Sequence, residues 1–287
     1  MSRYLKLIRV HQWHKNAFVL AGFFALGDYT NTRLLTAALI NALAFCFLSS
    51  AVYIINDFHD RHADRAHPVK RYRPLASGTV PVAHAFLLAA VLFVAALGLG
   101  RLNGLVSVLI LMSYFVITLA YTFGLKHLPI VDVFLIAFGF ILRLLAGTSG
   151  IAIEVSEWLL LTGFTASLLI GFVKRYGELA KYQNAHSHRM VLNRYSPAVL
   201  KTYISIMSGC TILLYMFYTV SPHAQALRGS TSLIYTVPFV IFGILRFLHL
   251  VFQDMTGDDP SELFMKDRIL LITVMLWAVV FGWLAYQ

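Results

Sequence analysis

Nine apolar segments make up most of this chain, and each is close to the roughly 20 residues that a helix needs to cross a lipid bilayer. They cover residues 14–27, 33–55, 81–100, 103–123, 130–149, 157–174, 198–220, 231–252 and 268–286. Only 13% of the 287 residues are charged and 59% are hydrophobic, whereas soluble domains carry about 25% charged residues. The pattern predicts an all-α polytopic membrane protein, with nine transmembrane helices packed as one bundle in a single domain over residues 1–287.

The basic residues are distributed unevenly over the loops between these segments. With a cytoplasmic N-terminus, 18 of the 23 Lys and Arg residues lie on the cytoplasmic side, against three (Arg33, Arg101 and Arg228) on the opposite side. Because loop Lys and Arg favour the cytoplasmic face, this asymmetry predicts an inner (plasma) membrane protein with its N-terminus and its active site in the cytoplasm. The formal net charge of +10 is then largely a topology signal, and no nucleic-acid partner is expected.

A charged stretch, NDFHDRHADRAHPVKRYRPLASG, follows the second apolar segment. Its carboxylates Asp57, Asp60 and Asp64 are spaced i, i+3, i+7, so they share one face if the helix continues through them. Such carboxylates repel one another unless a cation lies between them, and their hard oxygens suit Mg²⁺. The stretch therefore predicts a magnesium site, to which Asn56 adds an amide.

The basic residues that follow these carboxylates are Arg65, Lys70, Arg71 and Arg73. Lys and Arg side chains bind phosphate oxygens directly, and Arg can do so with two parallel hydrogen bonds. Acids for a metal beside bases for phosphate suit a Mg²⁺–pyrophosphate. The alternative is a solvated loop whose acids and bases neutralise each other.

A longer pattern favours the first of these interpretations. Asn56-Asp57-x-x-Asp60-x-x-x-Asp64, followed by His67-Pro68-x-Lys70-x-x-Arg73-Pro74-x-x-x-Gly78, resembles the first aspartate-rich motif of the UbiA superfamily of membrane prenyltransferases. The rest of the chain is similar to that superfamily throughout. The resemblance implies nine spans, active-site loops on the cytoplasmic face, and Mg²⁺ held by catalytic Asp57, Asp60 and Asp64 on a pyrophosphate that departs during transfer.

One departure from the pattern of the aromatic prenyltransferases points to one branch of the superfamily. Lys174-Arg175-x-x-Glu178 stands where aromatic prenyltransferases carry another acidic motif, Asp-x-x-x-Asp. This replacement, with Gln12-Trp13-x-Lys15-Asn16, resembles the decaprenyl-phosphate phosphoribosyltransferases. That resemblance implies transfer of 5-phosphoribosyl from phosphoribosyl pyrophosphate to a polyprenyl phosphate in the bilayer, for lipid-linked pentose and cell-wall synthesis. It leaves a homo-oligomer open.

Substrate-binding roles are expected for polar residues of these motifs and of the loops beside them. They are Lys15, Asn16, Asn56, Lys70, Arg73, Tyr121, Lys126, Asp132, Lys174, Arg175, His188 and Arg189. Two of them carry alternatives: Asp132 contacts either Mg²⁺ and ribose or a structural ion-pair partner, and Tyr121 is either a substrate contact or a membrane-interface anchor. Arg143 lies deeper in the fifth segment and is expected to be structural.

Two other functions fit parts of the sequence. An aromatic prenyltransferase of quinone or haem synthesis would use the same first motif, but the second acidic motif is missing. A transporter of anionic lipids or metabolites would also be polytopic. Transporters often show repeated halves and spans broken at the midplane, and neither is visible in the sequence.

Overall fold

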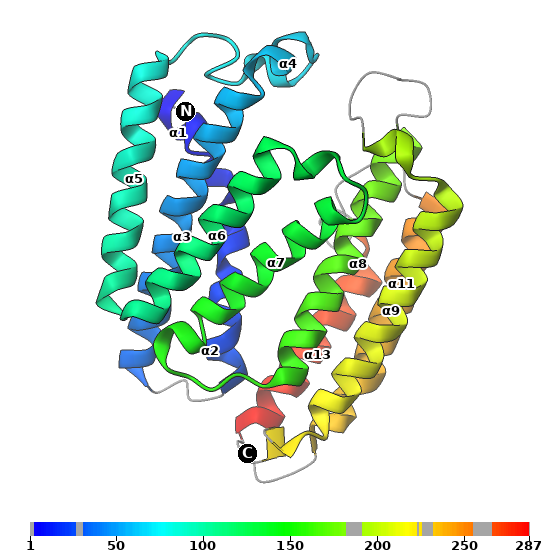
Figure 1. Ribbon diagram of the computed structural model, residues 1–287. Coiled ribbons are helices and arrows are strands. Elements are labelled where there is room, and N and C mark those ends of the chain that lie inside the picture. The colour runs from blue at the N-terminus through cyan, green and yellow to red at the C-terminus, as the bar shows by residue number, and fades with distance from the viewer. Residues whose placement is uncertain are drawn as a thin grey trace. The chain divides into compact units, whose positions relative to one another are not determined.

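The computed structural model describes residues 3–26, 31–181, 191–222, 224–225, 232–254 and 266–286, and every regular element within these ranges is helical. The α-helices are α1 (Arg3–Leu7), α2 (Leu20–Leu26), α3 (Thr32–His59), α4 (Arg61–Ala66), α5 (Val82–Leu102), α6 (Leu105–Phe123), α7 (Val131–Ala146), α8 (Glu157–Lys181), α9 (Pro197–Thr219), α11 (Val237–Asp254) and α13 (Arg268–Tyr286). Short 3₁₀ helices connect them: η1 (Val10–Val19), η2 (Lys70–Tyr72), η3 (Leu125–His127), η4 (Ser149–Ile151), η5 (Leu192–Arg194) and η6 (Ser232–Thr236). The all-α prediction is confirmed (Figure 1).

Seven helical stretches of the described chain are long and apolar enough to cross a membrane. They are Thr32–His59, Val82–Leu102, Leu105–Phe123, Val131–Ile151, Glu157–Ala180, Pro197–Thr219 and Leu233–Gln253. A shorter apolar helix covers Arg268–Leu284, and the first predicted segment is divided between η1 and α2. The chain is thus a multi-pass membrane protein.

The chain divides into two compact units. Unit 1 comprises Met1–Lys126 and Gly139–Val155, and unit 2 comprises His127–Phe138 and Ser156–Gln287. The boundary falls within α7, whose first half belongs to unit 2 and whose last half belongs to unit 1. The organisation of the whole chain as one domain stays a prediction.

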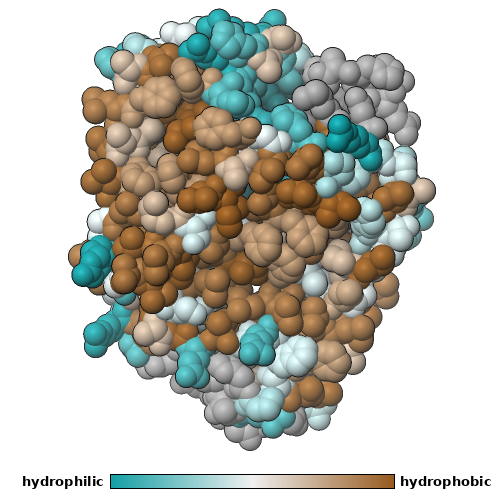
Figure 2. Space-filling model, in the orientation of Figure 1, coloured by the Kyte–Doolittle hydropathy of each residue, from teal (hydrophilic) through white to brown (hydrophobic). Residues whose placement is uncertain are grey.

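In unit 1, α3 packs along α5 and α6 (Figure 1). Its buried side is lined by Ala44, Phe45 and Leu48, each fully inaccessible to solvent, which pack in one core with Ala96 and Leu111. The outer sides of α5 and α6 carry exposed apolar side chains instead, as expected of surfaces that face lipid. Figure 2 shows this surface in brown, with polar side chains gathered at the end where α4 lies.

The N-terminal segment is held against the end of α7 by a close backbone approach. A Cβ atom added at Gly147 would lie 1.6 Å from the carbonyl oxygen of Val19, so only glycine permits this contact. The helix that follows, α3, begins with a side-chain cap in which Asn31 accepts a hydrogen bond from the Leu34 amide at 3.2 Å. η1 also packs against α3, the helix that carries the aspartate-rich motif.

In unit 2, α8 and α9 lie side by side (Figure 1). Their core includes Val133 from the first half of α7, Phe172 from α8 and Leu200 from α9. A Cβ atom at Gly171 would lie 2.5 Å from Val133 Cγ1, so α8 approaches α7 closely at this residue. The position of α7 against α8 brings Asp132 next to the Lys174-Arg175 pair.

Candidate active site

The aspartate-rich motif lies at the junction of α3 and α4. α3 ends at His59 and α4 begins at Arg61, with Asp60 between them at φ −85° and ψ 0°. The backbone hydrogen bonds continue through this junction, because the Asp60 amide donates to Asn56 O at 2.9 Å and the Asp64 amide donates to Asp60 O at 2.8 Å. The three carboxylates are therefore presented from successive turns of nearly continuous helical backbone.

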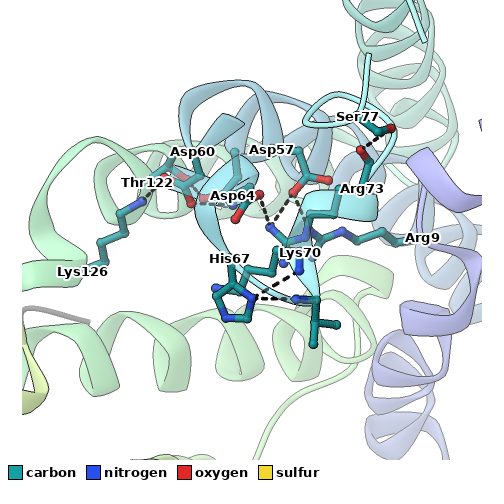
Figure 3. A network of polar contacts seen from close by, with 12 residues as sticks. Arg9, Asp57, Asp60, Asp64, His67, Lys70, Arg73, Ser77, Thr122 and Lys126 are labelled. Atoms are coloured by element: carbon teal, nitrogen blue, oxygen red, sulfur yellow. Dashed lines mark hydrogen bonds and ion pairs between the residues drawn. The ribbon is translucent and has the colours of Figure 1, made fainter. Parts of the chain in front are cut away.

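Asp57 and Asp64 are held by one guanidinium. Their exposed fractions are 2% and 4%. Nη1 of Arg73 lies 3.1 Å from Asp57 Oδ1 and 2.7 Å from Asp64 Oδ2, as Figure 3 shows. A single cationic nitrogen thus bridges two of the three predicted metal ligands.

A second guanidinium reaches Asp57 from the N-terminal segment. Nη2 of Arg9 donates a hydrogen bond to Asp57 Oδ1, the oxygen that Arg73 also contacts (Figure 3). Arg9 joins α1 to η1 in a left-handed conformation, with φ 52° and ψ 50°. Its guanidinium carbon also lies 4.9 Å from the ring centre of Tyr53. Arg9 was not among the predicted site residues, because it belongs to no motif.

The third carboxylate, Asp60, has different partners. Nζ of Lys126 donates to Asp60 Oδ1 at 2.6 Å (Figure 3), and the Asn56 amide donates to Asp60 Oδ2 at 3.3 Å. Asn56 in turn accepts a hydrogen bond from the Thr122 hydroxyl at 3.2 Å. Three predicted site residues therefore form one connected group with Thr122, a residue that was not predicted.

The loop after α4 shapes the basic side of the site. Nδ1 of His67 accepts hydrogen bonds from the backbone amides of Val69, at 3.1 Å, and Lys70, at 3.2 Å. The carbonyl of Arg73 accepts from the Ser77 hydroxyl at 2.9 Å. These bonds fix the turn that directs Arg73 toward the carboxylates and leave Lys70 half-buried beside them.

The donor atoms of this cluster fit a Mg²⁺ ion. Carboxylate and amide oxygens are the hard ligands that Mg²⁺ prefers, and one nitrogen of Arg73 already reaches both Asp57 and Asp64. Within the described ranges, no three His, Cys, Asp or Glu side chains are arranged around one point. Instead each carboxylate of the motif is paired with Arg9, Arg73 or Lys126.

Unit 2 holds a separate buried network around Asp132. This side chain is fully buried and Arg175 is 1% exposed. Arg175 donates from Nε to Asp132 Oδ2 at 2.6 Å and from Nη1 to Glu178 Oε2 at 2.6 Å. Of the two alternatives for Asp132, the structural ion pair is therefore present. Lys174, the neighbour of Arg175, is half-buried.

Tyr195 completes this network and was not predicted. Its hydroxyl donates to Asp132 Oδ1 at 3.1 Å and accepts a hydrogen bond from the backbone amide of Ile130. Burial raises the pKa of Tyr195 to about 12, so the hydroxyl stays protonated at neutral pH. Ile130 itself has a φ of 69°. Tyr195 thus secures the start of α7 and one oxygen of Asp132.

The remaining predicted residues lie in different surroundings. Asn16 is 2% exposed, and its Oδ1 accepts a hydrogen bond from Arg143 Nε at 2.8 Å. It therefore holds η1 against α7. Lys15 and Tyr121 are half-buried. The predicted residues His188 and Arg189 lie outside the described residues.

Arg143 is bound entirely within unit 1, as its predicted structural role requires. Beside Asn16, its guanidinium donates to Gly139 O at 2.7 Å and to the Tyr114 hydroxyl at 3.0 Å. Its guanidinium carbon lies 4.8 Å from the Tyr114 ring centre and 5.6 Å from that of Phe45. Neutral acceptors and aromatic faces together accommodate this buried cation.

Comparisons with known proteins agree with these observations. A model of the UbiA prenyltransferase family matches residues 16–271. The chain is 34% identical over 280 residues to a decaprenyl-phosphate phosphoribosyltransferase of Corynebacterium glutamicum, covering 95% of this chain and 83% of that protein. It is 32% identical to the protein of the same name from Mycobacterium tuberculosis, covering 97% and 92%.

The fold also matches a solved structure. A UbiA homologue from Archaeoglobus fulgidus bound to DMAPP and Mg²⁺ superposes with a TM-score of 0.72 at 17% identity, covering 99% of both chains. The resemblance seen in the aspartate-rich motif is confirmed by the family match and by this fold. The chain therefore belongs to the UbiA prenyltransferase family.

Proposed function

We propose that this chain transfers 5-phosphoribosyl from phosphoribosyl pyrophosphate to a polyprenyl phosphate of the decaprenyl type, releasing pyrophosphate. The observation that carries the proposal is its alignment, over 95% of its length, with a relative named decaprenyl-phosphate phosphoribosyltransferase. The basic pair Lys174 and Arg175, in place of a second acidic motif, supports it further. The product would be a lipid-linked pentose for cell-envelope glycans.

Asp57, Asp60 and Asp64 are the proposed metal ligands. Mg²⁺ bound there would neutralise negative charge on the departing pyrophosphate. Arg73, which contacts two of these carboxylates, and Lys70, which lies in the same loop, are proposed to donate hydrogen bonds to pyrophosphate oxygens. The support for this assignment is the oxygen-rich donor set and its three adjacent cations.

The transfer exchanges one C–O bond for another. The bond from ribose C1 to the pyrophosphate oxygen breaks, and an oxygen of the lipid phosphate forms the new bond to C1. The acceptor is ionised near neutral pH, so no side chain has to remove a proton from it. The protein therefore contributes positioning and stabilisation of the leaving group's charge.

The other predicted residues are assigned to the remaining substrate groups. Lys15, Lys174 and Arg175, with His188 and Arg189, are proposed to bind phosphate. Asn16 is proposed to act through its bond to Arg143, by holding Lys15 on η1. The other residues that are proposed to bind substrate are Asn56, Tyr121, Lys126 and Asp132.

The proposed membrane arrangement has nine spans in one domain. The first would be formed by η1 and α2 and the last by α13. The N-terminus and the active site would face the cytoplasm across the inner (plasma) membrane, because the basic residues concentrate on that side.

A product assay tests this function. The purified chain in lipid nanodiscs is incubated with Mg²⁺, phosphoribosyl pyrophosphate labelled in the ribose, and polyprenyl phosphate. We expect label to move into the lipid fraction, to stop on addition of a chelator, and to resume when Mg²⁺ is restored. A prenylated product from polyprenyl pyrophosphate and an aromatic acid would instead identify an aromatic prenyltransferase. Flux into vesicles without any product would identify a transporter.

A further inference from the structure

The bond between Arg9 and Asp57 links the N-terminal segment to the aspartate-rich motif. Asp57 is 2% exposed, and Arg9 lies 48 residues before it in the chain. Arg9 and Arg73 donate to the same oxygen, Asp57 Oδ1. A metal ion that used this carboxylate would therefore meet two guanidinium groups at the atom it has to bind.

The charges of the described cluster balance without a metal. Asp57, Asp60 and Asp64 are each paired with at least one of Arg9, Arg73 and Lys126. A divalent ion added to this set would be repelled by the cations that already occupy the carboxylates. Entry of the metal therefore requires at least one cation to leave its carboxylate.

Arg9 is the cation best placed to leave. Arg73 bridges two carboxylates from a turn that several hydrogen bonds fix, and Lys126 is 9% exposed. Arg9 contacts a single carboxylate. Its side chain is 18% exposed, less than the 26% of Arg73, so the difference between these two arginines lies in the number of carboxylates that each one holds. The ring of Tyr53, 4.9 Å from its guanidinium carbon, offers a contact that does not depend on Asp57.

The backbone at Arg9 also indicates a role for the side chain. Its left-handed conformation, at φ 52°, favours glycine and is unfavourable for other L-residues. Arginine at position 9 therefore carries an energetic cost in the backbone. Its side chain contacts the buried carboxylate of Asp57 and the ring of Tyr53, which offset that cost.

We propose that Arg9 is a further residue of the pyrophosphate site, acting as the counter-ion of Asp57 before the metal binds. When a divalent ion takes Asp57, the guanidinium moves from the carboxylate to the pyrophosphate that enters with the ion. Metal alone then binds weakly, whereas metal and pyrophosphate bind together. This inference rests on the proposed function, in which the motif holds a metal–pyrophosphate.

Metal binding without any reaction tests the exchange. Mn²⁺, as a paramagnetic probe for the Mg²⁺ site, is titrated into the purified full chain, and free Mn²⁺ is measured by electron paramagnetic resonance with and without inorganic pyrophosphate. We expect Arg9→Gln to bind Mn²⁺ alone about tenfold more tightly than the unaltered chain, because a competing charge-assisted bond is removed. In saturating Mn²⁺, the same variant should bind pyrophosphate about tenfold more weakly.

Arg3→Gln is the matched control. Arg3 lies in α1, the short helix that precedes Arg9, and carries the same charge, but it donates to the backbone oxygen of Thr79 at 3.3 Å. This variant should leave both dissociation constants within about twofold of the original values, because surface charges are screened at physiological salt. Equal shifts in the Arg3 and Arg9 variants would overturn the proposal, as would weaker Mn²⁺ binding by Arg9→Gln in both conditions.

Two further variants keep the test decisive. If Arg9→Gln does not fold, Arg9→Gly replaces it, since glycine adopts this backbone conformation without strain, and the same two shifts are expected. In a chain that already carries Asp57→Asn, replacing Arg9 should no longer strengthen Mn²⁺ binding. A retained tenfold gain there would overturn the proposal.

The outcome is separable from that of the proposed function. Both binding measurements use only metal and inorganic pyrophosphate, without ribose or lipid. If both binding shifts are found but the chain transfers no phosphoribosyl group, the proposed reaction is contradicted and the role of Arg9 is not. If the chain transfers the phosphoribosyl group but Arg9→Gln shows neither binding shift, only the role of Arg9 is contradicted.

Discussion

Nε of Arg175 lies 2.6 Å from Oδ2 of Asp132, and both side chains are almost completely withdrawn from solvent. Replacing Asp132 by Ala would leave the guanidinium buried without this carboxylate. We expect the free energy of unfolding to fall by about 3 kcal/mol, the usual result of breaking a buried ion pair on one side. Tyr195→Phe, which removes one hydrogen bond to the same carboxylate, should cost only about 1 kcal/mol. Unfolding in mixed micelles measures both, and equal losses would contradict this ranking.

The carboxylates of the aspartate-rich motif should control activity. Asp57→Asn and Asp60→Asn each keep the side-chain size but remove a negative charge from the proposed metal site. We expect phosphoribosyl transfer to fall by roughly 100-fold or more in each, because stabilisation of the leaving group is lost. Glu157→Gln, at an exposed residue in the first turn of α8, is the matched control and should keep full activity. Undiminished transfer by both motif variants would contradict the metal assignment.

The close approach of Gly147 to Val19 predicts a steric penalty. Gly147→Ala would place Cβ 1.6 Å from a backbone oxygen, so η1 must move away from α7. We expect a loss of stability of about 1–3 kcal/mol. Gly98→Ala in α5, where no atom lies within 4 Å of the added Cβ, should instead stabilise the helix by about 0.5–1 kcal/mol. Thermal unfolding of the two variants should thus shift in opposite directions.

Stability should depend on pH through Asp267. The hydrogen bond from Arg246 lowers the pKa of the Asp267 carboxyl, and Arg246 Nη2 lies 2.7 Å from Asp267 Oδ2. A carboxyl with a lowered folded-state pKa contributes stability above its unfolded pKa of about 3.9, and that contribution disappears as the pH falls through the folded-state value. Asp267→Asn should therefore be less stable than the original chain at pH 7, with the difference shrinking below pH 4. Thermal unfolding at pH 7, 5 and 3.5 checks this, and a difference as large at pH 3.5 as at pH 7 would contradict it.

The proposed nine spans and cytoplasmic N-terminus would place the C-terminus outside the cytoplasm. Alkaline phosphatase fused after Gln287 should be active in a bacterial host, and a green fluorescent protein fused there should be dark. The reverse result would mean an even number of crossings, in which η1 and α2 do not cross together. Fusions within the loop after α4, near Gly78, should give the cytoplasmic pattern.

Hydropathy identified the helices well and their ends less well. The second apolar segment was predicted to cover residues 33–55, whereas α3 continues to His59. α8 likewise continues to Lys181, beyond the predicted end at residue 174. Apolar side chains report burial in lipid, but a helix ends where its backbone hydrogen bonds end. The charged residues at both C-terminal ends remain helical although they are not apolar.

The acids of the candidate site could be read from their spacing, but most of their partners could not. The motif placed Asp57 and Asp64 together, and Arg73 follows in the same pattern. Arg9 is one of 23 basic residues, and nothing in its neighbours marks it as the partner of Asp57. Tyr195 is similarly remote from Asp132, at a separation of 63 residues. Contacts of this kind arise from tertiary packing, which local sequence does not encode.

The neutral surroundings of Arg143 have a consequence for biogenesis. The side chains that accept hydrogen bonds from its guanidinium are those of Asn16 and Tyr114, which precede Arg143 by 127 and 29 residues. When the ribosome delivers this cation to the membrane, both acceptors have already been synthesised. An arginine that is costly on an isolated helix can therefore be accepted as soon as it enters the bilayer. Chain order thus favours co-translational assembly of unit 1 from its N-terminus.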